Sequence, residues 1–176
     1  MKKQKQSELT SEEIMEIVKR VSDKWILMST IGREGGFPHG VFENKVHSAR
    51  CGRMGYPCKF FPKDIDSLLR AFTSIKAEIF HLSTYIPSEH NEACAEMLNE
   101  VLGKLTRIIP LRVFLEGLGI NDDQWQVRKS LKRQIHFSAE QLSDIRNICE
   151  NARFVLVDAI DALKRNDYVV DVIADE

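Results

Sequence analysis

Apolar residues recur at alternating intervals of three and four positions along residues 65–86. They are Ile65, Leu68, Phe72, Ile75, Ile79, Leu82 and Ile86. This spacing places all of them on one face of a helix of about six turns. Pro87 ends the helix, because proline has no backbone N–H group to continue the hydrogen bonding. A single apolar face is not stable alone in water, so the pattern predicts that other segments cover it.

A segment with similar spacing precedes this helix and another follows it. The first begins at Thr10 and Glu13, which form a capping-box signature, and ends at Gly32. The second begins near Ser88 and ends at Pro110, and the short turn before it predicts antiparallel pairing with the helix over residues 65–86. The apolar positions are Ile14, Val18, Val21, Trp25 and Met28 in the first, and Cys94, Leu98, Val101, Leu105 and Ile108 in the second.

A fourth long helix begins at Ser138, where Gln141 completes a second capping box. A shorter helix over about residues 121–134 precedes it. The sequence therefore predicts an all-α protein, an antiparallel bundle of four long amphipathic helices with a shorter fifth helix. We expect one contiguous core that includes Phe72, Ile75, Ile79, Leu98, Val101, Leu105, Ile145 and Leu156.

Residues 32–62 interrupt the helical pattern. Six of the nine glycines lie in this stretch, which predicts a long Gly-rich loop after the first helix, with short strands as candidates at residues 41–42 and 59–61. The loop belongs to a single helical domain over residues 9–166. We expect a disordered basic tail at residues 1–8 and an acidic tail at residues 167–176.

Composition narrows the class of protein. With 43% hydrophobic and 29% charged residues, the 176-residue chain has the composition of one soluble globular domain. The net charge of −1 gives no overall attraction to nucleic acid or membrane. The sequence has no signal-peptide pattern and no apolar run of membrane-spanning length, and its four cysteines are few and scattered. We therefore expect a cytoplasmic protein with no membrane partner.

The loop contains two histidines and two cysteines, namely His39, His47, Cys51 and Cys58. Two imidazoles and two thiolates suit a tetrahedral zinc ion, which would stabilise a loop that has no core of its own. The spacing matches no specific zinc motif, and apart from this zinc hypothesis we expect no cofactor. The alternative is that aromatic residues anchor the loop to the bundle, namely Phe37, Phe42, Tyr56 and Phe60.

Basic residues form two clusters that together are candidates for a nucleic-acid interface. The first lies in the loop and consists of Arg33, Lys45, Arg50, Arg53 and Lys59. The second lies on the shorter helix and consists of Arg128, Lys129, Lys132 and Arg133. Cations hold phosphates, and interleaved aromatic rings stack on bases. The alternative is an ordinary solvated surface.

Arg33 and His39 are separated by five residues. The separation resembles that of the arginine and histidine in the helical ribonucleases called HEPN domains, which pair these residues across a dimer. The resemblance implies a metal-independent ribonuclease with Arg33 and His39 in its active site. Gly35, Gly36 and Pro38 depart from the pattern, because the family places its motif at a helix.

These patterns favour a small helical binding or regulatory module that recognises a partner through residues 32–62. The partner is a protein or a second copy of this chain, with nucleic acid as a further candidate, because loops on rigid scaffolds commonly carry binding sites. The alternatives are the metal-independent ribonuclease and a zinc-stabilised interaction protein.

Overall fold

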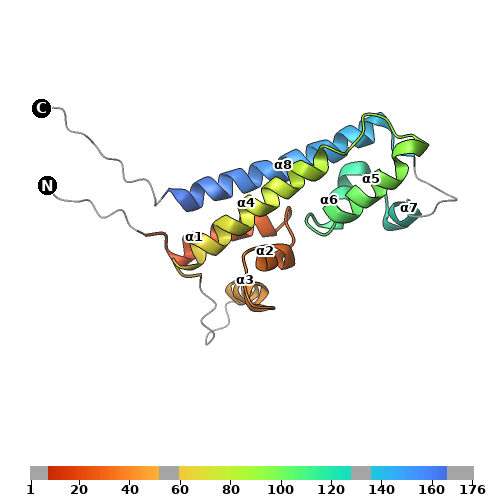
Figure 1. Ribbon diagram of the computed structural model, residues 1–176. Helices are drawn as coiled ribbons and strands as arrows, with labels where there is room; N and C mark the ends of the chain where they lie inside the picture. Colours follow the sequence, from red (N-terminus) through yellow and green to blue (C-terminus); the bar gives the residue numbers. More distant parts are fainter. Residues whose placement is uncertain (1–7, 52–59, 128–135, 166–176) are drawn as a thin grey trace, which may run out of the picture.

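The computed structural model describes residues 8–51, 60–127 and 136–165, and these residues form helices and no strand (Figure 1). The helices are α1 Ser11–Ser22, α2 Met28–Glu34, α3 Val41–Cys51, α4 Asp64–Ser83, α5 Glu92–Leu105, α6 Leu111–Leu118, α7 Asp122–Val127 and α8 Ala139–Lys164. The prediction of an all-α fold is confirmed. Within the described part of the chain, no helix is long and apolar enough to cross a membrane.

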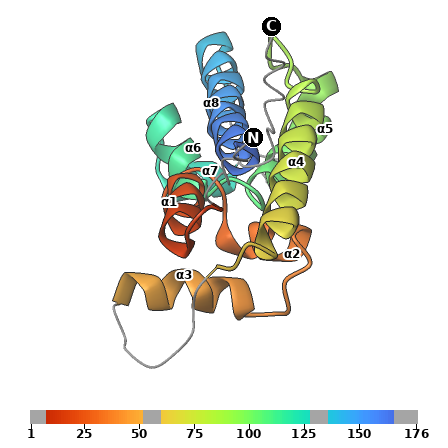
Figure 2. The ribbon, with the colours of Figure 1, turned by 90° about the vertical axis from the view of Figure 1, so that its left-hand side faces the viewer.

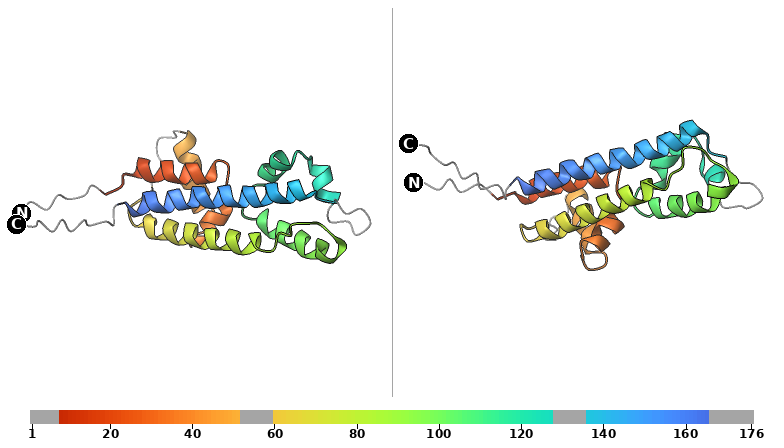
Figure 3. Two further views of the ribbon diagram at one scale, coloured as in Figure 1. Left: turned by 90° about the horizontal axis from the view of Figure 1, so that it is seen from above. Right: turned by 45° about the horizontal axis from the view of Figure 1, so that its top comes forward.

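The two longest helices, α4 and α8, pack side by side and form the axis of the molecule (Figures 1 and 3). Helices α1 and α6 pack against different ends of α8 (Figure 3). Helix α2 packs against α4, and Figure 2 shows α3 lying beneath α1 and α2. The architecture is therefore a pair of long helices with shorter helices attached, instead of the expected four long ones.

The apolar face predicted for α4 is buried. Leu68, Phe72, Ile75, Ile79 and Leu82 are almost completely covered. The eight residues predicted for the core all belong to one buried cluster, as expected. The face of α8 that enters this cluster includes small residues at Cys149, Ala152 and Ala159, which allow neighbouring helices to approach closely.

Two of the predicted helix starts are confirmed at atomic detail. The Glu13 N–H donates to Thr10 Oγ1 at 3.2 Å, and the Thr10 N–H donates to Glu13 Oε2 at 2.7 Å. Ser138 and Gln141 make the same reciprocal pair at 3.1 and 3.0 Å. Each box satisfies backbone N–H groups that have no partner inside the helix.

Helix α5 begins later than expected, which corrects the predicted start near Ser88. Asn91 is its N-cap, and its side chain accepts the N–H of Cys94 at 3.1 Å. Residues 84–91 therefore form a connection instead of a short turn. As a result α5 returns beside only the last turns of α4 (Figure 3).

The predicted first helix is two helices, α1 and α2, with a turn between them. The N–H groups of Trp25 and Ile26 both donate to the carbonyl oxygen of Val21, and the Leu27 N–H donates to the carbonyl oxygen of Ile108 at 2.8 Å. The turn buries Ile26 completely, whereas Trp25 remains partly exposed. A tertiary hydrogen bond and this burial thus override the regular apolar spacing.

Much of the expected Gly-rich loop is helical. Gly32 lies inside α2, and residues 41–42 begin α3 instead of a strand. Gly36 and Gly40 have φ values of +70° and +75°, which permit the tight turn between α2 and α3. Residues 60–61 are in no regular element. The predicted strand position 59, the second part of the predicted 121–134 helix, and the two tails except Glu8 lie outside the described residues.

Aromatic packing anchors this region, as the alternative to zinc predicted. The ring centroids of Phe37, Phe42 and Phe60 lie 5.4–6.5 Å from one another. Phe42 and Phe60 are buried, and Phe37 packs against the same core. The fourth predicted aromatic, Tyr56, lies outside the described residues. Three aromatic rings thus fasten the segment between α2 and α4 to the helical core.

Candidate binding groove

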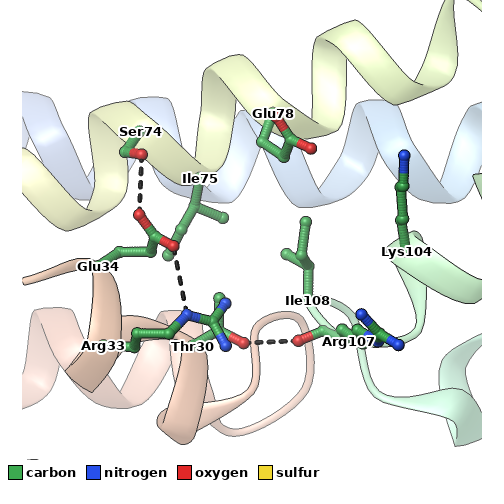
Figure 4. Close-up of a pocket in the computed structure, with 9 residues that line it drawn as sticks. All are labelled: Thr30, Arg33, Glu34, Ser74, Ile75, Glu78, Lys104, Arg107 and Ile108. Carbon is green, nitrogen blue, oxygen red and sulfur yellow. Dashed lines mark hydrogen bonds and ion pairs between the residues drawn. The ribbon is translucent and has the colours of Figure 1, made fainter.

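A groove follows one side of α4, with α2 and the end of α5 forming its opposite wall (Figure 4). Its first part is a cavity of about 340 Å³. The buried side chains of Ile75 and Ile108 lie at its base. The other lining residues are Thr30, Arg33, Glu34, Ser74, Glu78, Lys104 and Arg107. This part of the groove is polar along its walls and apolar beneath.

The groove continues between α4 and α5 into a second cavity of about 350 Å³. Glu78 and Lys104 line both cavities, so the two hollows are neighbours that share these side chains. Tyr85, Met97 and Val101 are the large side chains that line the second cavity beside its charged groups. Its remaining lining residues are His81, Leu82 and Glu100. We call the two neighbouring cavities together the α4 groove.

The wall opposite α4 is assembled from residues that are distant in sequence. The Thr30 hydroxyl donates to the carbonyl oxygen of Arg107 at 2.6 Å. With the bond from Leu27 to Ile108, this contact fixes α2 to the turn after α5. Thr30 is buried, so its hydroxyl needs such an acceptor. The arrangement places Arg33, on the last turn of α2, in the same cavity as Arg107 (Figure 4).

Charges of both signs line the groove. The Arg33 guanidinium, with 64% of its side chain exposed, contacts Glu34 at 3.4 Å, and Ser74 Oγ donates to the same carboxylate at 3.1 Å (Figure 4). Lys104 forms an ion pair with Glu100 at 2.9 Å, and the Glu100 carboxylate raises the pKa of Lys104 through its hydrogen bond and charge. Lys104 is therefore positively charged near neutral pH.

The exposed Arg107 guanidinium makes no hydrogen bond or ion pair with another described residue. Counted over both cavities, the groove has three cations and three carboxylates, so its formal charge is balanced. The cations are Arg33, Lys104 and Arg107, and the carboxylates are those of Glu34, Glu78 and Glu100. Arg107 is the cation that is best placed to receive a carboxylate or phosphate from a ligand.

The far end of the groove presents exposed apolar surface. Tyr85 is 44% exposed and Met97 is 38% exposed, although both are large side chains. The ring of His81 contacts the Tyr85 ring edge to face, with centroids 5.2 Å apart. Tyrosine, methionine and arginine are the residue types that are enriched in protein interfaces.

Among the residues predicted to bind nucleic acid, Arg33 lies in the groove and Lys45 does not. The Lys45 ammonium pairs with Asp64 at 3.1 Å, and both side chains are largely buried, with 14% and 12% exposed. It also lies 5.4 and 5.1 Å from the ring centroids of Phe60 and Phe61. Lys45 therefore fastens α3 to the start of α4, and this position gives no support to a role in phosphate binding.

The other predicted site residues are mostly beyond what the structure describes. Arg50, His47 and Cys51 lie on α3, but their side chains are outside the described part. Wholly outside it are Arg53, Cys58, Lys59, Arg128, Lys129, Lys132 and Arg133. Helices α3 and α7 lie apart in the molecule (Figures 1 and 3). The joint basic face stays a prediction, because most of its residues lie outside the described part.

The zinc and ribonuclease hypotheses both involve His39. This residue is exposed in the turn between α2 and α3, and no hydrogen bond joins it to Arg33. Within residues 8–51, 60–127 and 136–165, no three histidine, cysteine or acidic side chains are grouped to hold a metal ion. The zinc hypothesis stays a prediction, because the side chains of His47, Cys51 and Cys58 lie outside the described part. The ribonuclease hypothesis also stays a prediction, because the family pairs its arginine and histidine across a dimer.

Sequence reasoning did not identify Lys104, Arg107, Tyr85 or Met97 as site residues. Each lies on an ordinary amphipathic helix or the turn beside it, and no local motif marks it. Comparison of the chain with family models, with curated proteins and with solved structures finds no match. The function of the groove must therefore be inferred from its own chemistry.

Proposed function

We propose that the protein is a binding module that holds a peptide segment of a protein partner in the α4 groove. The observation that carries the proposal is a pair of neighbouring cavities, both lined by Glu78 and Lys104, that combine free charge with exposed large side chains. The first cavity offers Arg33 and Arg107, and the second offers Tyr85 and Met97. Such side chains, clustered in a concave site, are typical of the residues that dominate the binding energy of protein interfaces.

The balanced charge of the groove favours a peptide over a nucleic acid. A phosphate chain that follows the groove would pass Glu34, Glu78 and Glu100, and like charges repel each other. A peptide carries carboxylates, amines and apolar groups in one molecule, so it can match both signs of charge. Nucleic-acid binding is therefore the competing outcome of the experiment below.

The order of the lining residues indicates what the peptide carries. An acidic side chain suits the end with Arg33 and Arg107, where the Arg107 guanidinium is exposed. An aromatic or long aliphatic side chain suits the end with Tyr85 and Met97. Along α4 the groove extends from Ser74 to Tyr85, about 16 Å at 1.5 Å per residue. That length accommodates about five residues of extended peptide.

The proposal is tested by selecting binders from a displayed library of random ten-residue peptides with the full chain. The expected winners contain an acidic residue and, a few positions away, an aromatic or long aliphatic residue. Arg107→Gln should weaken a selected peptide roughly tenfold or more, because a hydrogen bond to a charged group contributes about 1.5–3 kcal/mol. Tyr85→Ala should weaken it as well.

The matched control is Arg70→Gln, which removes an exposed cation from α4 that lines neither cavity. Its affinity for the peptide should equal that of the unmodified chain. Peptides that bind all three variants equally would place the site elsewhere. Failure to select any peptide, together with tight and steeply salt-dependent binding of single-stranded RNA, would replace the peptide by a nucleic acid.

A further inference from the structure

The apolar end of the α4 groove depends on a connection that is fastened to α8. Residues 84–91 join α4 to α5 and carry Tyr85, which lines the groove. The last turn of α4 holds the first half of the connection, because the N–H groups of Tyr85 and Ile86 donate to the carbonyl oxygens of Leu82 and Ser83 and Ile86 is buried. Two further hydrogen bonds hold its second half. The Arg146 guanidinium donates to the carbonyl oxygen of Pro87 at 2.9 Å, and the Phe137 N–H donates to Nδ1 of His90 at 2.9 Å.

His90 and its hydrogen-bond donor Phe137 both pack against a buried aromatic cluster. The His90 ring stacks on the Phe137 ring, with centroids 5.9 Å apart and planes inclined by 26°. Phe137 is buried, and its ring centroid lies 6.4 Å from that of Trp125. The ring centroids of Trp125 and Phe114 lie 5.8 Å apart. Because Phe137 immediately precedes the N-cap of α8, His90 links the connection to the start of that helix.

The bond requires a neutral imidazole. Nδ1 can accept the Phe137 N–H only with its lone pair free, so the proton of neutral His90 lies on Nε2. Protonation turns Nδ1 into a donor, and two N–H groups then face each other. The contact is therefore lost or strongly weakened when His90 becomes charged.

A second histidine acts against that protonation. The ring centroid of His136 lies 4.8 Å from that of His90. Burial, and then the charge of His136, lower the pKa of His90 below its ordinary value. The other charged groups on the described elements around His90 are Arg146 on α8, and Glu89 and Glu92 on its own side. None of these three is a cause of the shift.

We propose that His90 is a pH-sensitive clip that regulates the α4 groove, because its protonation releases residues 87–91 and with them the start of α5, the helix that carries Met97. The effect on binding rests on the proposed function, whereas the release of the connection does not. The direction of the pH effect follows from the linkage between protonation of His90 and closure of the connection. The clip stabilises the closed connection above the pKa of a free imidazole, about 6.5, and this stabilisation is lost as the pH falls below that value.

The release is tested on the full chain by hydrogen–deuterium exchange at pH 7.5 and pH 5.0, with rates corrected for their intrinsic pH dependence. We expect residues 88–91 and the Phe137 amide to lose protection at pH 5.0, whereas the amides of Thr84, Tyr85 and Ile86 stay protected. The protection factors of the released amides should fall about tenfold for each pH unit by which the clip lowers the pKa of His90. An NMR titration of the same protein should show His90 titrating below the pKa of a free imidazole, about 6.5.

Three substitutions separate the clip from general acid sensitivity. His90→Asn keeps an acceptor near the Nδ1 position without a titrating group, so protection should no longer depend on pH. His136→Asn should reduce the pH effect, because it raises the pKa of His90 in the clip. His39→Asn, which changes an exposed histidine elsewhere, should behave like the unmodified chain.

A peptide selected against the groove provides the binding arm of the experiment. It should bind more weakly at pH 5.0 than at pH 7.5, and His90→Asn should remove more than half of that difference. Equal loss of protection in the unmodified chain and in His90→Asn, or titration of His90 at or above about 6.5, the pKa of a free imidazole, would overturn the clip. Intact pH-dependent release with no groove-binding peptide would instead overturn the proposed function alone.

Discussion

Replacing Asp64 by alanine is expected to destabilise the protein by about 3–5 kcal/mol, because removal of one partner of a buried ion pair leaves the other charge uncompensated. Asp64 Oδ2 accepts from the Lys45 ammonium at 3.1 Å and from the Phe61 N–H at 2.8 Å. Both groups would lose this acceptor at a place that water reaches poorly. The free energy of unfolding, measured with urea, provides the test.

The control for this substitution is Asp66→Ala. Asp66 lies in the same first turn of α4 and is exposed, so the two substitutions remove the same favourable charge from the helix N-terminus. That charge contributes about 0.3–1 kcal/mol at an exposed position. Similar decreases in the free energy of unfolding for the two variants would show that Asp64 acts only through the helix dipole. Adding Lys45→Met to Asp64→Ala should restore part of the lost stability, because the buried ammonium is then absent.

Replacing Phe72 by alanine is expected to cost about 3–5 kcal/mol, because it removes a completely buried ring and leaves a cavity between tightly packed helices. Phe72 lies in the middle of the apolar face of α4, which packs against α8. Urea unfolding measures the loss. Phe80→Ala removes the same side chain from the same helix at a position that is 52% exposed, and it should cost much less. Equal losses for the two variants would contradict the packing of α4.

The long helices could be predicted from the sequence because their signals are local. The capping boxes at Thr10 and Ser138 and the apolar spacing of α4 and α8 each depend on residues within a few turns of one another. The break between α1 and α2 has no such signal. It depends on the bond from Leu27 to Ile108, which forms only when distant segments have packed together.

Helix α3 was missed for a different reason. Its buried positions in the described residues are Phe42 and Val46, a spacing of four that fits a helix but is too short to be distinctive. Among the described glycines of this stretch, Gly32 lies inside α2, whereas Gly35, Gly36 and Gly40 lie in the turn before α3, the last two with positive φ. The glycine content thus predicted the turn before α3 correctly, but it gave no indication of the helix itself.

The candidate site was only partly predictable. Arg33 was selected as a residue of the glycine-rich stretch, and the structure places it in the groove. Lys104 lies at the end of α5, and Arg107 lies in the turn that follows. They line the same cavity as Arg33 because α2 packs beside them. A surface that is assembled from several elements leaves no spacing motif in the sequence.

The location of the binding site is the central claim, and NMR shift mapping tests it most directly. Full-length protein labelled with ¹⁵N is titrated at pH 7.5 with a peptide selected from the library. The largest amide shift changes should fall in residues 30–34, 74–85 and 97–108, which surround the α4 groove. Changes concentrated on α1 and around Phe154 of α8, with the groove residues unaffected, would contradict it.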